Sequence, residues 1–141
     1  GFVFCTSLTS PKSRQIDANP RVSLTFWWER AGLQVRVSGF ASPIAAEDAD
    51  SFFDARSADA QLASWAFDQS APLDPAESAA DRLRDARQRF GDSPIPRPPH
   101  WGGYLVAPQR MEFLRFAENR AHERVRYDRV NGTWLRSELQ P

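Results

Sequence analysis

The chain has 141 residues, a length that fits one ordinary domain (residues 1–141) with a sizeable core. Its 18 basic and 18 acidic side chains cancel, which argues against general binding to nucleic acid or to a membrane surface, so any anion site must be local. The one cysteine, Cys5, excludes an intrachain disulfide, and with only two histidines beside it no usual metal-ligand spacing occurs.

Two expectations concern the cellular location of the protein and the completeness of the sequence. No signal-peptide pattern and no apolar run long enough to span a bilayer occur, and a lone cysteine favours a reducing compartment, so we expect a cytoplasmic protein. Residues 1–6 have the pattern of a buried strand with neither Met nor a loop before them. We therefore expect a piece that lacks its upstream strands.

The first part of the chain is predicted to contain a helix and a hairpin. Residues 11–18 can form a short helix that ends at an Asn-Pro pair. Residues 22–28 and 34–40 alternate and are rich in β-branched and aromatic side chains, which predicts two strands. A glycine between them indicates that the strands pair as a hairpin.

The middle of the chain is predicted to be helical. Residues 45–56 begin with acidic side chains, which suit a first helical turn, and residues 58–67 form a second, shorter candidate. A third helix is expected to start at Asp74-Pro75, with Asp as N-cap and Pro at its first position. In that helix, an apolar stripe predicted to lie in the core is formed by Ala79, Leu83, Ala86 and Phe90.

The last part of the chain is predicted to return to strands. Residues 93–99 hold four prolines and should form a stiff, extended linker. Strands are expected after it at 104–106, 111–116, 124–130 and 134–139. Asn131-Gly132 between the last two is a strong signal for a type I′ hairpin. This order favours an α+β domain with an antiparallel sheet, which we expect to curl into a barrel.

The motif with the most chemical content is Arg120-Ala121-His122-Glu123-Arg124. In an extended strand the two arginines and the histidine would project from one face. Two permanent cations on either side of an imidazole suit an anionic ligand that must also be polarised. The alternative is a solvated strand face with no ligand.

Other polar positions give weaker signals. Lys12 lies at the start of the first predicted helix, where a phosphate can dock, although a plain surface cap is the alternative. Gln34 and Arg36 share one strand face, which can equally be a wet sheet face. Gln69-Ser70 lies in a turn, where local backbone hydrogen bonding is the ordinary role. Because no catalytic triad, carboxylate pair or Walker-type loop stands out, an enzyme would take its chemistry from a cofactor.

The ordered segments of the chain resemble those of the pyridoxine/pyridoxamine 5′-phosphate oxidase family of flavoenzymes over residues 1–141. The segments that carry the resemblance are GFVFCT, NPRVSLTFWW, QVRVSG, PRPPHWGGY, RAHERVRY and WLRSELQP. The resemblance implies a split β-barrel that forms a homodimer with FMN at the subunit interface, and a segment after residues 93–99 that serves dimerisation and substrate binding. It implies oxidation of pyridoxine or pyridoxamine 5′-phosphate to pyridoxal 5′-phosphate, with O2 as acceptor and H2O2 as product.

The resemblance also implies site residues. Thr6 and Lys12 would hold the flavin phosphate, and the full set of expected FMN contacts is Cys5, Thr6, Lys12, Gln34, Gln69, Ser70 and Arg124. Arg56 would bind the substrate phosphate, and the substrate positions are Phe52, Arg56, Ala60, Arg120, Ala121 and His122. Arg120 and His122 would act as the catalytic pair over the substrate ring. No metal is implied.

The chain departs from the family pattern at four positions. Pro11 replaces an Arg beside the phosphate-binding Lys, Leu114 replaces a flavin-contacting Trp, and Phe52 and Ala60 replace a phosphate-binding Tyr and Ser. The hydroxyl donors lost at Phe52 and Ala60 would each weaken phosphate binding by roughly 1 kcal/mol or more. Two alternatives therefore stand beside the vitamin B6 reaction. One is a related flavin oxidase of a reduced ring such as a dihydrophenazine, and the other is a non-catalytic protein that binds flavin or a B6 phosphate.

Overall fold

The computed structural model describes the whole chain, Gly1–Pro141, and its contacts form two compact units. The sheet unit consists of Gly1–Phe2, Pro20–Ser42 and Val106–Pro141, and the helical unit consists of Val3–Asn19 and Pro43–Leu105. The predicted α+β class with an antiparallel sheet is confirmed. The expectation of a single domain with a linker at residues 93–99 stays a prediction.

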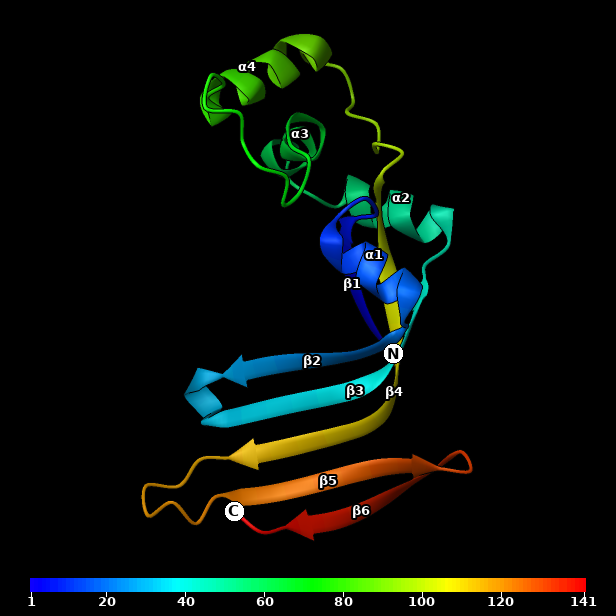
Figure 1. Cartoon of the computed structure of the whole chain (residues 1–141), viewed down its shortest axis with the longest axis vertical. Helices are drawn as coiled ribbons and strands as arrows, with labels where there is room; N and C mark the ends of the chain where they lie inside the picture. Colours follow the sequence, from blue (N-terminus) through cyan, green and yellow to red (C-terminus); the bar gives the residue numbers. More distant parts are fainter. The chain divides into compact units, whose positions relative to one another are not determined.

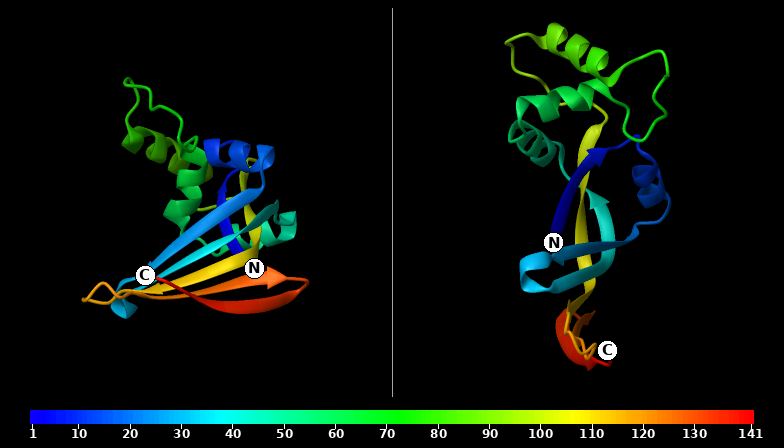
Figure 2. Two further views of the ribbon diagram at one scale, coloured as in Figure 1. Left: turned by 60° about the horizontal axis from the view of Figure 1, so that its bottom comes forward. Right: turned by 90° about the vertical axis from the view of Figure 1, so that its left-hand side faces the viewer.

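Five strands lie side by side in the order β2-β3-β4-β5-β6 (Figure 1; Figure 2, left). Their bounds are β2 Arg21–Trp28, β3 Leu33–Pro43, β4 Trp101–Arg115, β5 Glu123–Val130 and β6 Thr133–Leu139. The pairs β2–β3, β4–β5 and β5–β6 are antiparallel. Side chains of β3 alternate as expected, since Val35 and Val37 are buried whereas Arg36 between them is exposed.

The two predicted hairpins are present. A short 3-10 turn, η1 Glu29–Ala31, joins β2 to β3 and ends at Gly32, whose φ of 56° favours glycine. Asn131 and Gly132 join β5 to β6 with φ values of 50° and 82°. Two consecutive positive φ values suit a type I′ turn, and Asn and Gly are the residues that adopt them most easily.

Strand β4 corrects a prediction. The sequence suggested two strands separated near Pro108, but β4 is continuous from Trp101 to Arg115. A proline is tolerated where the ladder does not need its N–H, and Pro108 lies outside the stretch Arg110–Arg115 in which β4 pairs with β5. Gly39 of β3 lies close to this point, because a Cβ built on it would collide with the Ala107 carbonyl oxygen and lie 3.0 Å from Pro108 Cα. The missing side chain of Gly39 gives the β4 backbone room here.

The helical unit contains β1 and four helices. Strand β1, Phe2–Ser7, pairs with β4, and the two strands run together in the right-hand view of Figure 2. Its helices are α1 Pro11–Ala18, α2 Ala46–Asp54, α3 Ala58–Ala66 and α4 Ala79–Phe90. Fully or nearly fully buried rings of Phe53, Trp101 and Tyr104 form part of the interior of this unit. The first three helices were expected to within two residues at each end.

Helix α4 begins later than the sequence suggested, at Ala79 rather than at Asp74-Pro75. The Asp74 carboxylate instead accepts a hydrogen bond from the Ala76 N–H at 2.9 Å, a local turn. Ser78 caps the helix, because its hydroxyl accepts from the Asp81 N–H at 3.0 Å and donates to the Asp81 carboxylate at 2.7 Å. Ala79, expected in the core, is exposed at this first turn.

The remaining stripe of α4 behaves as expected. Leu83, Ala86 and Phe90 pack against Leu62 and Ala66 of α3.

No helix combines the length and the apolar character that crossing a bilayer needs. No group of three or more His, Cys, Asp and Glu side chains is placed to hold a metal ion.

The close approach of Gly39 to β4 gives a test of this packing. We expect Gly39→Ala to lower the free energy of unfolding by about 1–3 kcal/mol, because the added methyl group meets backbone that cannot move without disturbing the sheet. Chemical denaturation measures the change. Gly102→Ala is the control, since its methyl group would meet only the Leu8 side chain, at 3.1 Å, and should cost less. Equal losses in the two variants would contradict this account.

Candidate functional site

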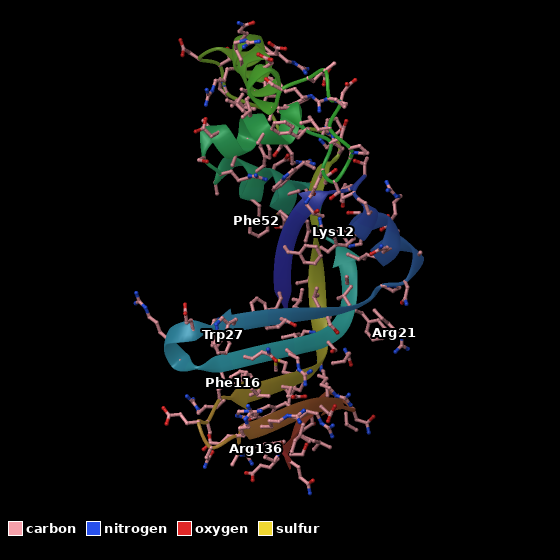
Figure 3. The ribbon with its side chains drawn as sticks, turned by 60° about the vertical axis from the view of Figure 1, so that its left-hand side comes forward. Lys12, Arg21, Trp27, Phe52, Phe116 and Arg136 are labelled. Carbon is pink, nitrogen blue, oxygen red and sulfur yellow. The ribbon has the colours of Figure 1, made fainter.

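Three of the expected FMN contacts meet in the helical unit. Lys12 Nζ donates to Thr6 Oγ1 at 2.8 Å, and the Thr6 hydroxyl donates to Gln69 Oε1 at 2.9 Å. The Ser7 N–H donates to the same Gln69 oxygen at 3.0 Å. We call Thr6, Ser7, Lys12 and Gln69 the Lys12 cluster; Figure 3 labels Lys12 on α1. Residues 63 positions apart are thus joined around the chain's only lysine.

Two buried serines determine the position of Lys12. Ser10 is the N-cap of α1, and its hydroxyl accepts from the Ser13 N–H. The Ser13 hydroxyl donates to the Ser7 carbonyl oxygen at 2.7 Å. Both serines are fully buried, so these hydrogen bonds satisfy groups that water does not reach. They fix the connection from β1 to α1, and Lys12 in the first turn therefore reaches back to the end of β1.

A cavity of about 250 Å³ adjoins this cluster. It is lined by Cys5, Thr6, Ser7, Arg56, Ala63, Ser64, Phe67, Gln69, His100 and Trp101. The Arg56 guanidinium lies 5.0 Å from the centre of the Trp101 ring, and His100 Nε2 lies 3.1 Å from the Ser64 carbonyl oxygen. Burial raises the pKa of the Cys5 thiol, and the charge of Arg56 opposes that rise. One fixed cation in a small polar cavity suits a singly or doubly charged anion.

Three other expected contacts do not line this cavity. Phe52 projects from α2 with 43% of its surface exposed (Figure 3). Ala60 lies in the first turn of α3, where its N–H donates to the N-cap Ser57 hydroxyl at 3.4 Å. Ser70 is exposed, with a φ of 66° that is unusual for a residue other than glycine. The structure therefore brings Arg56 to Cys5, Thr6 and Gln69, but not these three residues.

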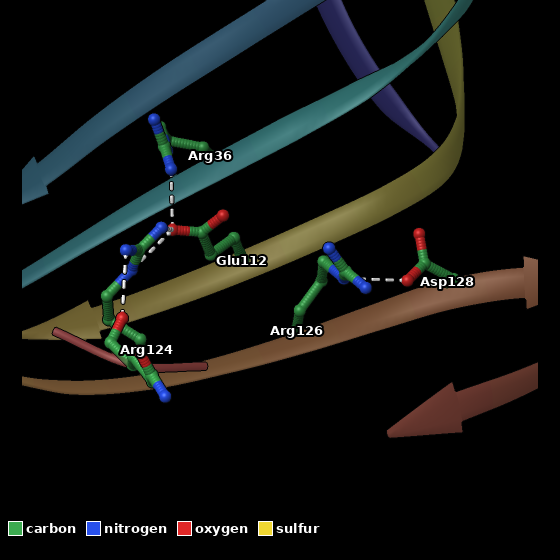
Figure 4. Close-up of polar contacts among 6 residues, drawn as sticks. Arg36, Glu112, Arg124, Arg126 and Asp128 are labelled. Carbon is green, nitrogen blue, oxygen red and sulfur yellow. Dashed lines mark hydrogen bonds and ion pairs between the residues drawn. The ribbon is translucent and has the colours of Figure 1, made fainter. Parts of the chain in front are cut away.

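The sheet unit holds a second polar group, centred on Glu112 of β4 (Figure 4). Its side chain is 10% exposed, and its Oε1 accepts hydrogen bonds from Arg36 Nη2 at 2.5 Å and from Arg124 Nη2 and Nε at 2.8 and 3.1 Å. Arg124 Nη1 also donates to the Gln140 carbonyl oxygen at 3.1 Å. Arg124 is therefore paired and partly buried, not freely solvated.

The electrostatics of this group favour a charged carboxylate. Burial of Glu112 opposes ionisation, but hydrogen bonds to Arg124 and Arg36 and their charges outweigh burial and lower its pKa from the ordinary value of 4.5. Two positive charges and one negative charge leave a net charge of +1 on this trio. Gln34 lies two residues from Arg36 on the same face of β3.

The expected one-face arrangement is wrong for Arg120, whereas His122 and Arg124 line one cavity of about 290 Å³. Strand β5 begins only at Glu123, and Arg120 lies in a preceding bend with a φ of 63°, so strand alternation does not apply to it. Arg120 is exposed, and the Ala121 N–H donates to the Asn119 side chain at 3.0 Å. His122 Nδ1 accepts from the Ala117 N–H at 3.1 Å. The proton of a neutral His122 ring is therefore on Nε2.

The rings of His122, Phe116 and Trp27 form a row at one end of the sheet unit, and Trp27 is the strand partner of Gln34. The His122 ring centre lies 5.1 Å from that of Phe116, and Phe116 meets Trp27 edge to face at 5.2 Å (Figure 3). Trp27 is directly opposite Gln34 in the β2–β3 register. Sequence reasoning missed Phe116, Trp27 and Glu112 as parts of a site. The alternation of Met111-Glu112-Phe113 was a usable signal, since it places an acid on the same sheet face as the arginines of neighbouring strands.

Comparison with known proteins identifies the family. Residues 1–90 match the family described as pyridoxamine 5′-phosphate oxidase. Residues 101–141 match the pyridoxine 5′-phosphate oxidase C-terminal dimerisation region. The chain belongs to the pyridoxamine 5′-phosphate oxidase family. Relatives named pyridoxine/pyridoxamine 5′-phosphate oxidase from Rubrobacter xylanophilus and Sphingopyxis alaskensis are 46% and 40% identical over all of the chain, which spans 65% of the length of each.

Solved structures support the split-barrel fold expected for this family. The chain is 32% identical to PhzG from Burkholderia lata, solved in complex with tetrahydrophenazine-1-carboxylic acid, with a TM-score of 0.91 over 100% of this chain and 69% of that chain. A pyridoxamine 5′-phosphate oxidase-related, FMN-binding protein from Nostoc punctiforme is 19% identical, with a TM-score of 0.78 over 99% of this chain and 72% of that chain. The second likeness concerns the fold alone.

The lowered pKa of Glu112 gives a pH test. Its folded pKa lies below the unfolded value, so its contribution to stability is full above about pH 4.5 and disappears as pH falls through the folded pKa. We expect Glu112→Gln to be less stable than wild type at neutral pH, with a difference that shrinks steadily as the solution is acidified below that value. Urea denaturation between neutral and acid pH measures it. A difference that does not change with pH would mean that the Glu112 charge does not stabilise the fold.

Proposed function

We propose that this chain forms the FMN-binding and catalytic part of an oxidase that converts pyridoxine or pyridoxamine 5′-phosphate to pyridoxal 5′-phosphate, with O2 as acceptor and H2O2 as product. The observation that carries the proposal is the Lys12 cluster, in which residues expected at the flavin phosphate meet in a family member. The names of the relatives from Rubrobacter and Sphingopyxis support the same reaction. A cytoplasmic location agrees with it.

The donors in the helical unit fit a phosphate group. The Lys12 ammonium donates one of its three N–H groups to Thr6 Oγ1, so the other two can donate to a phosphate. The Thr6 hydroxyl and the Ser7 N–H each donate their one proton to Gln69 Oε1, so a phosphate would accept from them by taking the place of that oxygen. In the sheet unit, Gln34 and Arg124 are proposed to contact the flavin ring.

The bound flavin would supply the electron acceptor for the hydride that leaves substrate C4′. This chain's residues supply binding and orientation. Arg56, with its guanidinium over Trp101, is proposed to bind the substrate phosphate. Arg120 has no side-chain partner within the chain, so its charge is available to position the substrate. His122, held through Nδ1, presents Nε2–H to orient the ring.

A second candidate is a flavin oxidase that acts on a reduced ring without a phosphate, such as a dihydrophenazine acid. The similarity to PhzG supports it, as do Phe52 and Ala60, which carry no hydroxyl where the family pattern has one. A chain that binds flavin but turns over neither substrate would be a binding protein, the third alternative.

We further propose that the protein is a homodimer. Residues 101–141 match a dimerisation region, and in that region an apolar groove of about 540 Å³ is lined by Met111, Phe113, Val125, Tyr127, Trp134 and Arg136. Partly exposed apolar side chains gathered in one groove favour an interface. Sedimentation of the purified protein at several concentrations tests the proposal, and a monomer throughout would contradict it.

Flavin binding gives the first test of function. Wild-type protein titrated with FMN should quench flavin fluorescence, and Lys12→Ala should raise the FMN Kd about tenfold or more through loss of a charge-assisted contact. Arg14→Ala is the matched control, because it removes a cation from the same helical turn that donates to the Thr9 carbonyl oxygen outside the cluster. Since Lys12 is the only lysine, FMN should also protect it from an amine reagent. A wild-type protein that binds no FMN would overturn all flavin-dependent proposals.

Turnover gives the second test. Arg120→Ala should lower H2O2 release with pyridoxine 5′-phosphate by about a hundredfold while leaving FMN bound, because misplaced substrate reacts slowly. Arg124→Ala should instead raise the FMN Kd about tenfold. An oxidase assay and an FMN titration of both variants measure these effects, and the reverse pattern would refute the assigned roles. Faster turnover of a dihydrophenazine acid than of pyridoxine 5′-phosphate would favour the second candidate.

A further inference from the structure

The hydrogen bonds of Arg124 restrict its guanidinium on two sides. Nε and Nη2 donate to Glu112 Oε1, and Nη1 donates to the Gln140 carbonyl oxygen. A guanidinium has five N–H groups, so three used in this way leave two. Because the group is planar, bonds through Nε, Nη1 and Nη2 determine both its plane and the direction of the remaining donors.

Glu112 is suited to hold this geometry. Its side chain is only 10% exposed, whereas Arg124 is 25% and Arg36 is 48% exposed, so the carboxylate lies inside and both cations keep a surface for a ligand. Figure 4 shows the two guanidinium groups converging on the Glu112 carboxylate from the flanking strands β3 and β5. A partly buried ion pair with several hydrogen bonds keeps one arrangement better than a solvated pair does.

We propose that Glu112 is a positioning residue for FMN, whose carboxylate holds the Arg124 guanidinium in the orientation that binds the flavin. The inference rests on the proposed function, which assigns Arg124 to the flavin but gives Glu112 no role. Glu112 acts through Arg124 and does not itself touch the flavin. Preorganised donors cost less to order when the ligand arrives, so their loss appears as weaker flavin binding.

Whether FMN affinity rises or falls in a Glu112 variant distinguishes a positioning role of the carboxylate from a simple effect of its charge. Glu112→Gln keeps the size of the side chain and raises the net charge of the trio from +1 to +2. If charge alone mattered, an anionic cofactor would bind more tightly to this variant, most clearly at low salt. Positioning predicts the opposite, a loss of affinity.

The experiment is a double-mutant cycle on the full chain with FMN as the probe. We expect Glu112→Gln to raise the FMN Kd about tenfold, the usual effect of losing an outer partner that orients a ligand-binding group. Arg124→Gln should raise it at least as much, and the double variant should bind no more weakly than Arg124→Gln alone. The absorption bands of bound flavin, compared between wild type and Glu112→Gln, give a second readout of its surroundings.

Asp128→Asn is the matched control. Asp128 lies on the same sheet face, and its two oxygens pair with Arg110 at 2.6 Å and Arg126 at 2.7 Å, but none of these residues is assigned to the flavin. The FMN Kd of this variant should stay within about twofold of wild type, because the ion pairs that it loses hold no residue assigned to the flavin. Thermal unfolding of each apo variant measures the purely structural effect.

Several outcomes would overturn the inference while the proposed function stands. The first is tighter or unchanged FMN binding by Glu112→Gln. The second is a further loss of FMN affinity when Glu112→Gln is added to Arg124→Gln. If Glu112→Gln does not fold, Glu112→Asp keeps the charge but moves it by one methylene group. An FMN Kd for that variant equal to wild type would also overturn the inference. Wild-type protein that fails to bind FMN would overturn the proposed function, and this inference with it.

Discussion

A carboxylate withdrawn from water needs cations beside it, and this requirement links strand pairing to site assembly in the sheet unit. Glu112 receives one arginine from each neighbouring strand, Arg36 of β3 and Arg124 of β5. The alternation that exposes Arg36 also buries Val35 and Val37 on the other face. A slip of one residue in any of these strands would bury a charge among apolar side chains and unpair the carboxylate. The same register therefore serves both the core and the polar face.

In the helical unit, the Lys12 cluster is held mainly by contacts between residues that are close in the sequence. Ser10 and Ser13 satisfy each other and the Ser7 carbonyl oxygen within a short stretch, so the first turn of α1 is fixed relative to the end of β1. Lys12 needs no long-range contact to reach Thr6. Only Gln69 comes from a distant segment, and it accepts from a hydroxyl and a backbone N–H that are already in place. Most of this cluster is therefore built from local contacts, and Gln69 adds the long-range one.

Local signals predicted much of the fold and failed where two signals competed or a distant residue decided. Asp74 and Ser78 are both good N-caps, and only the reciprocal hydrogen bonds of Ser78 with Asp81 show which one starts α4. Pro108 normally suggests a break, but the missing side chain of Gly39 on the neighbouring strand gives β4 room to continue. Neither outcome is visible in a window of ten residues, because each depends on which partner is nearby in space.

The candidate site divides in the same way. Resemblance to a family grouped Thr6, Lys12 and Gln69 as FMN contacts, and the structure joins these three residues by hydrogen bonds. Strand alternation misplaced Arg120, because the chain bends before β5 begins. Glu112 escaped notice because an acid in an amphipathic strand usually faces water. Its partners lie 76 and 12 residues away, a separation that single-sequence patterns do not report.

The residues proposed for flavin and those proposed for substrate differ in how firmly the chain holds them. Thr6, Gln69 and Arg124 are tied into hydrogen-bond networks before any ligand arrives. Phe52 and Arg120 are exposed and have no polar side-chain partners. Residues that are already held in place by hydrogen bonds favour one ligand strongly. Unpaired side chains can adapt to different ligands at little cost in stability. A substitution such as Phe for Tyr at position 52 can therefore change which substrate is accepted while the flavin contacts stay intact. The departures at Phe52 and Ala60 then concern the proposed substrate positions, whereas Pro11, beside Lys12, and Leu114 concern the proposed flavin site.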